Sequence, residues 1–442
     1  MTISFGTDGV RGIANQELTV EHALALGRAS ARVLDGGRVV IGRDPRHSGP
    51  MLESALAAGF AAEGWAVERL GVVPTPAVAW AASQRDAAGA MVSASHNPFA
   101  DNGIKVFARG GRKLGDVVEA AIAAELAAAV RRGPTAGPTG PAVGTITDGP
   151  AEGVVAAYVE HLLGTVGSLD GLRVVLDCAH GAAAGLAATV FGRAGASILV
   201  LHDSPDGVNI NDGVGATALG PLQAAVVAHG ADVGLAFDGD ADRCLAVDHT
   251  GAVVDGDQLI ALCALDRRAR GRLVQDAVVV TVMTNLGFRQ AMTRAGIEVV
   301  ETAVGDRYVL EALDARGLSL GGEQSGHVIF RELASTGDGM LTGLQVLDTV
   351  RRSGRPLSVL AAEAMTRLPQ ILRSVRVNGS AKAAVAALAE EIAAVAAELG
   401  DRGRVLVRAS GTEPVVRVMA EAPSAAEAAV AVDRLVAAVE GI

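Results

Sequence analysis

Three aspartates stand at two-residue intervals directly after a run of apolar residues in the middle of the chain. The run DVGLAF (232–237) continues as DGDADR, which contains Asp238, Asp240 and Asp242. In an extended loop this spacing points all three carboxylates the same way, and a cation between them relieves their repulsion. Three hard oxygen ligands suit Mg²⁺ better than Zn²⁺. The sequence therefore predicts a magnesium site here.

Two other interpretations of this segment are weaker. An EF-hand fails because, counted from Asp238, position six is Arg243 rather than glycine and position twelve is His249 rather than glutamate. A solvated acidic turn is the second, and the position at the end of a buried strand favours a ligand site instead. Arg243 beside the metal predicts a second cation that contacts the same phosphoryl group.

A second apolar strand opens onto a loop rich in polar groups. AAGAMV is followed by SASHNPFADNGIKVF (93–107), which holds Ser93, Ser95, His96 and Lys105. No G-x-S-x-G pattern is present, which argues against an α/β-hydrolase. A serine with a lysine and a nearby magnesium site fits phosphoryl transfer better than acyl transfer. Ser93 and Ser95 are equal candidates on chemistry alone, and a capping role for either serine is the alternative.

Two further loops carry polar groups at strand ends. GGEQSGHVIF (321–330) places Glu323, Ser325 and His327 alternately along a predicted strand end, which favours recognition of sugar hydroxyls. A solvent-facing strand edge would have the same pattern.

RVLVRASGTEPVVRVMAE (404–421) is predicted to form strand, loop and strand. Its hydroxyls, free N–H groups and two guanidinium groups describe a phosphate-binding loop, made of Arg408, Ser410, Gly411, Thr412 and Arg417. The alternative is a hairpin with ordinary exposed arginines.

The elements that position these loops follow a repeated pattern. An apolar strand, a polar turn with glycine and a helix recur at residues 39–49, 173–185 and 277–288. Continuous Val/Ile/Leu runs are typical of strands covered by helices on both faces. We expect three similar α/β domains with mixed, largely parallel sheets, followed by a smaller α+β C-terminal domain with helices over 381–399 and 424–439.

Domain boundaries are expected where the composition changes. The Gly/Pro-rich residues 131–150 are interpreted as a linker, with a long surface loop inside one domain as the alternative. Further breaks fall near Asp255 and Pro369. The predicted domains are therefore 1–150 with the serine loop, 151–254 with the metal loop, 255–368 with the sugar loop and 369–442 with the phosphate loop.

The bulk composition limits the partners. Half of the 442 residues are apolar, only 3% are aromatic, and the formal charge is −11. These values argue against a nucleic-acid partner but leave room for a small anionic ligand bound by local arginines. Three cysteines without CxxC spacing, no secretory signal and no apolar span predict a cytoplasmic protein that does not bind membranes.

The four loops, in this order, resemble those of the α-D-phosphohexomutase superfamily, and the match runs from Phe5 to Ala420. The resemblance implies three similar α/β domains and a smaller C-terminal domain around a central cleft. It also implies that Ser95 is the phosphorylated serine, that the DGDxDR loop binds Mg²⁺ with Ser95 as a further ligand, that GExSG recognises the sugar, and that SGTEP holds the substrate's phosphate. Arg11, in GTDGVRG, would steady phosphate charge near the serine loop.

Within the superfamily, several segments are similar to the branch that interconverts glucosamine 6-phosphate and glucosamine 1-phosphate, namely FGTDGVRGIAN (5–15), MVSASHNP, VGDRYVLE (304–311) and GGEQSGH. One departure is Ala303, where relatives often carry a basic residue. The implied reaction proceeds through phosphoserine and a sugar bisphosphate, which also acts as activator, with one Mg²⁺ per chain. It would supply amino-sugar nucleotide precursors for the cell wall.

In that reaction the candidate catalytic groups besides Ser95 are Lys105 and His327 as proton carriers, Arg243 as a charge partner, and His96. The partner is a small phosphosugar, and a homodimer is left open. Alternatives are a mutase for mannose or glucose phosphates, or a metal-dependent phosphatase with an aspartate nucleophile.

Overall fold

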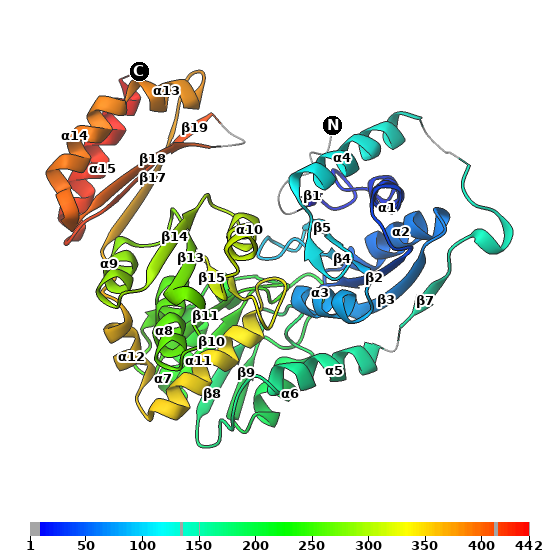
Figure 1. Cartoon of the computed structure of the whole chain (residues 1–442), viewed down its shortest axis with the longest axis horizontal. Coiled ribbons are helices and arrows are strands. Elements are labelled where there is room, and N and C mark those ends of the chain that lie inside the picture. Colours follow the sequence, from blue (N-terminus) through cyan, green and yellow to red (C-terminus); the bar gives the residue numbers. More distant parts are fainter. Residues whose placement is uncertain (1–8, 133–135, 150, 411–413, 442) are drawn as a thin grey trace. The chain divides into compact units, whose positions relative to one another are not determined.

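The computed structural model describes residues 9–132, 136–149, 151–410 and 414–441. They form two compact units. The first contains the described residues up to Val282 together with Glu298–Ala362, and the second contains Met283–Ile297 and the described residues from Glu363 onward. The first unit holds three sheets and the second holds one (Figure 1).

The first sheet has the strand order β1-β5-β4-β2-β3-β7, with β6 paired to β5. Pairing is parallel from β4 through β2 and β3 to β7 and antiparallel at β1, β5 and β6. Helices α1 and α2 cover one face and α3 the other (Figure 1). The elements are β1 (Val10–Ile13), α1 (Val20–Val33), β2 (Arg38–Arg43), α2 (Gly49–Ala62), β3 (Ala66–Val72), α3 (Thr75–Gln84), β4 (Ala88–Val92), β5 (Asp101–Ala108), β6 (Arg112–Lys113), α4 (Asp116–Arg132), the 3₁₀ turn Gly140–Ala142 and β7 (Ile146–Asp148).

The second sheet has the order β12-β11-β10-β8-β9, parallel at β8, β9 and β10 and antiparallel beyond β10. Strand β10 is buried along its whole length because helices cover both faces of the sheet. The elements are α5 (Ala151–Leu163), β8 (Arg173–Asp177), α6 (Ala187–Arg193), β9 (Ser197–Leu201), the 3₁₀ turn Gly215–Thr217, α7 (Gly220–His229), β10 (Val233–Phe237), β11 (Cys244–Asp248) and β12 (Val253–Val254).

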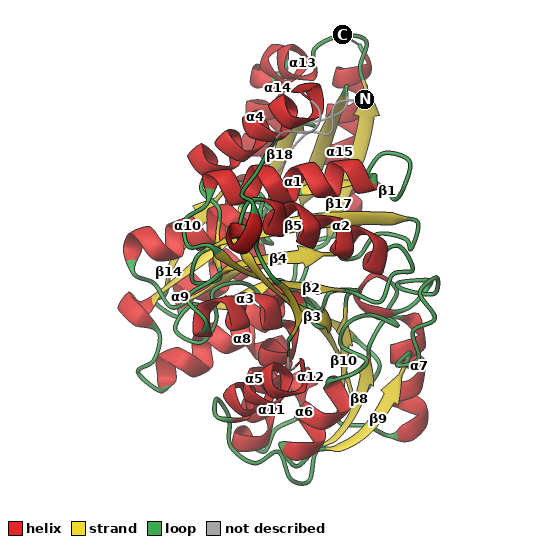
Figure 2. Cartoon of the chain, turned by 90° about the vertical axis from the view of Figure 1, so that its right-hand side faces the viewer, coloured by secondary structure: helices red, strands yellow, loops and turns green. Residues whose placement is uncertain are grey.

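The third sheet has the order β14-β13-β15-β16, with β16 antiparallel to β15. Figure 2 shows the strands of the first unit lying between layers of helix. The elements are α8 (Gly256–Ala269), the 3₁₀ turn Val274–Asp276, β13 (Ala277–Thr281), β14 (Glu298–Thr302), α10 (Asp306–Arg316), β15 (Leu320–Gly322), β16 (Val328–Phe330), α11 (Gly339–Ser353) and α12 (Leu357–Ala364), which leads along the chain into the second unit.

The second unit is a three-stranded antiparallel sheet, β17-β19-β18, with helices packed on one face. Helix α9, which follows β13 in the sequence, belongs to this unit, because Leu286 N donates to Glu421 at 2.7 Å and Gln290 donates to the Asp401 carbonyl at 3.1 Å. The elements are α9 (Leu286–Arg294), β17 (Gln370–Arg376), α13 (Ala381–Ala387), α14 (Ala389–Leu399), the 3₁₀ turn Gly400–Arg402, β18 (Arg404–Ala409), β19 (Val415–Glu421) and α15 (Ala425–Glu440).

The predicted fold class is confirmed: three α/β sheets of mixed pairing are followed by a small α+β C-terminal region. Two details differ. The helix expected over 381–399 is divided at Leu388, so that two short helices cover the sheet, and both pack against β18. The four domain boundaries stay predictions.

The segment 131–150 is more than a linker in its described part. Residues 146–148 form β7, which extends the first sheet in parallel with β3, and Gly144 N donates to the Ala61 carbonyl at 2.9 Å. The open edge of β3 has free N–H and C=O groups, and β7 satisfies them. The alternative of a long segment within one domain therefore describes residues 140–148 better.

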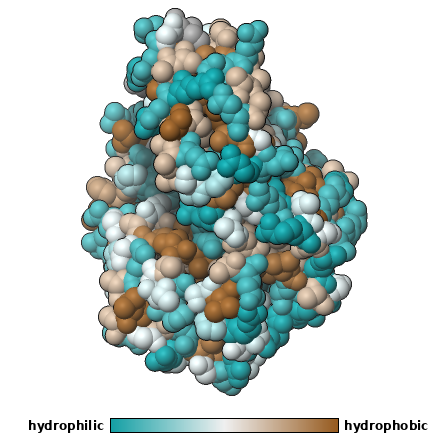
Figure 3. All heavy atoms as spheres, turned by 90° about the vertical axis from the view of Figure 1, so that its left-hand side faces the viewer, coloured by the Kyte–Doolittle hydropathy of each residue, from teal (hydrophilic) through white to brown (hydrophobic). Residues whose placement is uncertain are grey.

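One face of the molecule is visible in a space-filling view (Figure 3). Figure 3 shows hydrophilic side chains over much of the visible face, with apolar atoms in small separate patches. In the described part of the chain, no helix combines the length and apolar character needed to span a bilayer.

Candidate active site

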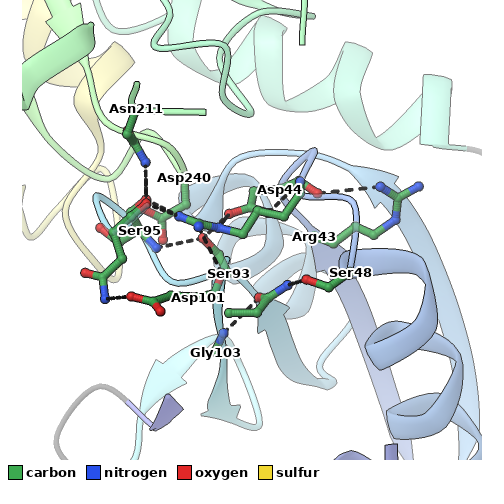
Figure 4. Close-up of polar contacts among 12 residues, drawn as sticks. Arg43, Asp44, Ser48, Ser93, Ser95, Asp101, Gly103, Asn211 and Asp240 are labelled. Carbon is green, nitrogen blue, oxygen red and sulfur yellow. Dashed lines mark hydrogen bonds and ion pairs between the residues drawn. The ribbon is translucent and has the colours of Figure 1, made fainter. Parts of the chain in front are cut away.

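The serine loop leaves the carboxyl end of β4 and turns sharply at Ser95, whose φ is +53°. The Ser95 hydroxyl is buried and donates to Asp238 Oδ2 at 2.5 Å. The Ser93 hydroxyl instead donates to Asp44 at 2.6 Å and accepts the Ser95 N–H at 2.9 Å (Figure 4). The two serines thus differ in surroundings: Ser93 supports the loop, and Ser95 faces the aspartates.

The aspartate loop joins β10 to β11 and is a tight turn, with Ala241 at φ +56°. The expectation of an extended loop is wrong, because this turn, rather than alternation along a strand, makes the carboxylates converge. One oxygen each of Asp238, Asp240 and Asp242 lies within 4.8 Å of the others, and all three residues are buried.

The donor set fits a divalent cation. Asp240 Oδ1 and Asp242 Oδ1 are buried and accept no hydrogen bond from the described residues. Buried carboxylate oxygens in native proteins nearly always have a partner, and hard oxygen ligands of this kind are those that bind Mg²⁺ or Ca²⁺. The three aspartates and the adjacent Ser95 hydroxyl are therefore a candidate metal centre.

The surrounding charges divide the triad into unlike members. Burial raises the pKa of Asp238 well above its ordinary value, and the neighbouring Asp242 and Asp240 raise it further. Burial also acts on Asp240, but the Lys105 ammonium and the Thr75 hydroxyl outweigh it and hold the pKa of Asp240 below its ordinary value. Lys105 Nζ donates to Asp240 at 2.9 Å and to Asp242 at 3.0 Å. Thr75 donates to Asp240 at 2.6 Å.

Arg243 ends the aspartate loop and adds a second cation. Its backbone N–H donates to Asp238 Oδ1 at 3.2 Å, and its Nε lies 3.9 Å from Asp242 Oδ1. Burial would lower the pKa of this guanidinium, but the charges of Asp238 and Asp242 outweigh burial and raise it. Lys105 and Arg243 together offset much of the triad's negative charge.

His96 and Arg11 lie at the same centre. His96 Nδ1 is 3.4 Å from Ser95 Oγ. Burial lowers the pKa of His96, and the positive charges of Arg243 and Arg11 lower it further. Arg11 lies on β1, which pairs with β5, the strand that carries Lys105.

The predicted sugar-recognition residues directly follow the end of β15, as expected, but they lie in the turn to β16, so the expected alternation along a strand is wrong. Glu323 N donates to the His327 carbonyl at 2.9 Å, which closes the turn around Ser325. The tight hairpin needs a left-handed residue, which Gly326 supplies at φ +90°. The turn also meets the aspartate loop, because Cys244 N donates to the Gly326 carbonyl at 3.0 Å.

Several polar atoms of this turn are buried and have no hydrogen-bond partner among the described residues. Ser325 Oγ and both ring nitrogens of His327 make no hydrogen bond with the described residues, although His327 Nε2 lies 3.5 Å from Asp306 Oδ2. Burial raises the pKa of Glu323, which also accepts the Gly305 N–H at 3.1 Å. Unpaired hydroxyl and imidazole groups are ready to bind a polar ligand.

The serine and aspartate loops are in direct backbone contact. A Cβ added to Gly239 would lie 2.5 Å from the Ser95 carbonyl oxygen. Only glycine permits this approach, and through it the Ser95 hydroxyl reaches Asp238. The structure therefore brings together the predicted Ser95, Lys105, Arg243 and aspartate triad.

The predicted phosphate loop belongs to the second unit. Arg408 and Arg417 are direct cross-strand partners on β18 and β19, and Ser410 N donates to the Val415 carbonyl at 2.8 Å. Burial lowers the pKa of Arg408, and the nearby charge of Arg417 lowers it further. Gly411 and Thr412 lie outside the described residues.

Sequence reasoning missed five polar residues at or near the first-unit site. Thr75 anchors Asp240, and Lys113 pairs with Asp306 beside His327. Arg46 and Asn211 both donate to the Ser95 carbonyl. Arg46 stands in VVIGRDPRHSG, at the carboxyl end of a buried strand, and that position was the available signal.

Family models match four segments of the chain. They describe phosphoglucomutase/phosphomannomutase alpha/beta/alpha domain I at residues 2–132, domain II at 156–251, domain III at 255–368 and the C-terminal domain at 372–438. Together the segments take up most of the 442 residues.

Individual relatives match over nearly the whole chain. A phosphoglucosamine mutase of Frankia casuarinae is 56% identical, with 98% of this chain and 97% of the relative covered. A crystal structure of a phosphoglucomutase/phosphomannomutase family protein from Burkholderia thailandensis aligns with a TM-score of 0.86 at 28% identity, covering 99% and 98% of the two chains. The fold also matches N-acetylphosphoglucosamine mutase of Aspergillus fumigatus in complex with GlcNAc-6P and magnesium, with a TM-score of 0.66 at 20% identity and 100% and 96% covered.

Proposed function

The chain belongs to the phosphoglucomutase/phosphomannomutase family, and from this premise we propose that it interconverts glucosamine 6-phosphate and glucosamine 1-phosphate through a phosphoserine at residue 95. The substrate follows from the relatives named phosphoglucosamine mutase, which are 53–56% identical over almost the full chain. The product would feed the synthesis of amino-sugar nucleotides for the cell wall, in the cytoplasm.

One observation carries the phosphoserine proposal: the buried Ser95 hydroxyl donates to one of three convergent carboxylates. In the proposed reaction the bond between phosphorus and Ser95 Oγ breaks as a bond to the free sugar hydroxyl forms, giving a sugar bisphosphate. After the bisphosphate turns over, the other phosphoryl group returns to Ser95. Catalysis of this type depends mostly on positioning and charge stabilisation.

Asp238, Asp240, Asp242 and Ser95 are the residues that would hold Mg²⁺, which when bound supplies positive charge against the transferring phosphoryl group. The free oxygens of Asp240 and Asp242 support this assignment. Arg243 adds charge from the protein itself.

Proton transfer is assigned to two groups. Lys105, whose Nζ donates hydrogen bonds to Asp240 and Asp242, is the first candidate to exchange a proton with the reacting oxygens or to balance their charge. His327, whose ring nitrogens make no hydrogen bond with the described residues, is the second. His96 and Arg11 would steady the phosphate on Ser95.

The rest of the substrate is assigned to two loops. Glu323 and Ser325 would hydrogen-bond the sugar hydroxyls. Arg408, Ser410 and Arg417, with Gly411 and Thr412 of the same segment, would hold the phosphate that is not reacting.

The test is a phosphosite map of the purified protein after incubation with glucose 1,6-bisphosphate, combined with kcat/KM for the 6-phosphates of glucosamine, glucose and mannose. We expect phosphate on Ser95 and the highest kcat/KM for glucosamine 6-phosphate. Phosphate on an aspartate, with release of inorganic phosphate, would instead indicate a phosphatase. Higher kcat/KM for glucose or mannose phosphate would reassign the substrate within the family.

A further inference from the structure

Ser95 needs an external support for its backbone. A non-glycine residue at φ +53° occupies the sparsely populated left-handed region, which persists only when its surroundings fix it. The carbonyl of this residue faces inward, toward hydrogen-bond donors from two different parts of the first unit.

The first donor is Arg46, in the turn between β2 and α2, whose side chain is fully buried. Its Nη2 donates to the carbonyls of Ser95 at 2.9 Å and Asn97 at 2.8 Å. Its Nη1 donates to the carbonyls of Pro98 and Asp101, the latter at 2.9 Å. Four of the five guanidinium N–H groups are therefore used on a single turn, the one that carries Ser95.

The fifth N–H group of Arg46 donates to Asp44. Asp44 is in turn bonded to the serine loop through the hydroxyl of Ser93. Arg46 Nε donates to Asp44 Oδ2 at 2.9 Å, and the same oxygen accepts the Ser93 hydroxyl at 2.6 Å. Ser93 Oγ then accepts the Ser95 N–H. Both the N–H and the carbonyl of Ser95 are thus held by one buried ion pair, and Figure 4 shows Asp44 and Ser93 beside Ser95.

The second donor is Asn211, from the segment that follows β9 of the second sheet. Its Nδ2 donates to the carbonyls of Ser95 at 2.9 Å and Asn97 at 3.1 Å, the same two that Arg46 Nη2 binds (Figure 4). Asn211 is itself fixed, because its N–H donates to the Ala179 carbonyl at 3.0 Å. The serine turn is therefore held from two sides.

We infer that Arg46 and Asn211 are positioning residues, which set the distance between the Ser95 oxygen and the aspartate triad during phosphoryl transfer. This inference rests on the proposed phosphoserine function. The Ser95 carbonyl also touches Gly239 of the aspartate loop, so a shift of that carbonyl changes the place of Ser95 Oγ relative to Asp238. Neither side chain contacts the reacting atoms, and their effect is on geometry alone.

Asn211→Ala is the first test, with Asn209→Ala as its matched control. Asn209 lies in the same segment, and among the described residues the partners of its side-chain amide are Ser204 and Asp206. We expect Asn211→Ala to lower kcat by about 10-fold with KM within about twofold, since misplacement of a reacting group costs turnover rather than ground-state binding. Asn209→Ala should keep wild-type kcat.

Arg46→Lys is the second test, with Arg43→Lys as control. Lysine keeps the charge opposite Asp44 but cannot reach four carbonyls from one nitrogen, so we expect kcat to fall by about 10- to 100-fold. Arg43 pairs with Glu53 and makes no hydrogen bond to the serine turn among the described contacts. In the double variant the loss should be smaller than the product of the single losses, because both side chains hold the same carbonyls.

The decisive measurement is the single-turnover rate of phosphoryl transfer from phosphorylated enzyme to glucosamine 1-phosphate, alongside the melting temperature. A slower transfer step in Asn211→Ala, with the melting temperature of its control, supports positioning. Transfer rates equal to those of the controls, or losses that follow the melting temperature in all four variants, overturn it. If wild-type enzyme carries no phosphate on Ser95, the proposed function itself fails, which this experiment reports separately.

Discussion

Charged side chains are arranged differently in the two units. The serine and aspartate loops of the first unit pair opposite charges, whereas the hairpin of β18 and β19 in the second unit, called the arginine hairpin here, places Arg408 opposite Arg417. In the first unit Lys105 bonds to Asp240 and Asp242 at 2.9 and 3.0 Å, so opposite charges satisfy each other inside the protein. In the hairpin Arg408 and Arg417 are cross-strand partners of like charge, and neither forms an ion pair with a carboxylate of the described residues. Like charges placed opposite each other destabilise a sheet.

The same sheet shows that this arrangement is local. Glu421 lies between Gln370 and Arg404 in the strand register, and it accepts hydrogen bonds from both. Four residues along the strand, on the same face, Arg417 has Arg408 on one side and Ser374 on the other, without an acid. The first unit therefore pairs its opposite charges within the protein, whereas the pair Arg408 and Arg417 is an arrangement that a bound anion, as proposed, would offset.

The largest expected effect is that of Ser95→Ala. If Ser95 carries the phosphoryl group as proposed, its removal leaves only uncatalysed or rerouted transfer, so kcat should fall by about four orders of magnitude or more. The measurement is a coupled assay with glucosamine 6-phosphate, together with phosphosite mapping. Ser93→Ala, which keeps the carrier but loses the bond to Asp44, should be far less impaired. Equal losses in the two variants would contradict the distinction drawn between the serines.

Metal removal should be the next largest effect and should act on the first unit alone. Chelation is expected to lower activity by about 100-fold or more, with recovery on adding Mg²⁺, because three crowded carboxylates lose their counter-ion. Mg²⁺ at 100 times its Kd should also increase the free energy of unfolding by about 2.7 kcal/mol, and the melting temperature should rise accordingly. Asp240→Asn should weaken both responses, and Asp212→Asn, an exposed carboxylate, should not. A melting temperature that does not change with divalent cations would contradict the proposal that the aspartate triad binds a metal ion.

The hairpin should respond in the opposite manner, through substrate binding. Arg417→Ala is expected to raise KM for glucosamine 6-phosphate by about 10-fold, because a charge-assisted bond to phosphate is lost. It should leave the melting temperature equal or higher, since a like-charge pair is relieved. Arg373→Ala, on the helix-covered face of the same sheet and paired with Asp433, serves as control. An unchanged KM in Arg417→Ala would contradict the proposal that the arginine hairpin binds the substrate's phosphate.

Sequence patterns predicted the parts of the site that depend on local chemistry. Apolar runs that end in polar residues placed Ser95 and the aspartates at strand ends, where parallel sheets gather ligands. Lys105 was expected in the serine loop, but it lies within the antiparallel strand β5. The backbone conformation of each loop was harder to predict from the sequence. The aspartates converge through a left-handed turn at Ala241, and Glu323 lies in a hairpin turn, because tight turns override simple alternation.

The residues that hold the site were not predictable from such patterns. Arg46 and Asn211 bind backbone carbonyls of a turn that lies 49 and 116 residues away in sequence. A side chain that donates to a carbonyl places no demand on the residue type of its partner, so neither position leaves a paired signal in one sequence. The parallel pairing of β7 with β3 was missed for a related reason, since backbone hydrogen bonds need no apolar run.

The smallest expected effect concerns Asp338, a buried carboxylate whose pKa is governed mainly by burial. Asp338 is buried, accepts the Tyr158 hydroxyl at 2.6 Å and caps helix α11 through Leu341 N at 2.9 Å. Burial raises the pKa of Asp338 to about 6, against about 3.9 in an unfolded chain. The folded state therefore binds the proton more tightly, and its extra stability is fully present below about pH 4 and is lost as pH rises through about 6.

Asp338→Asn removes this titration, so the stability of wild type relative to the variant should increase by about 2–3 kcal/mol between pH 7 and pH 4. Denaturant unfolding of both proteins at four pH values measures that difference, with Asp212→Asn as control. The contrast with Asp240 is direct, because there Lys105 holds the pKa low and burial of the charge is compensated. A pH-independent difference would show that Asp338 is compensated as well, and that the aspartate triad is not special in pairing its charges.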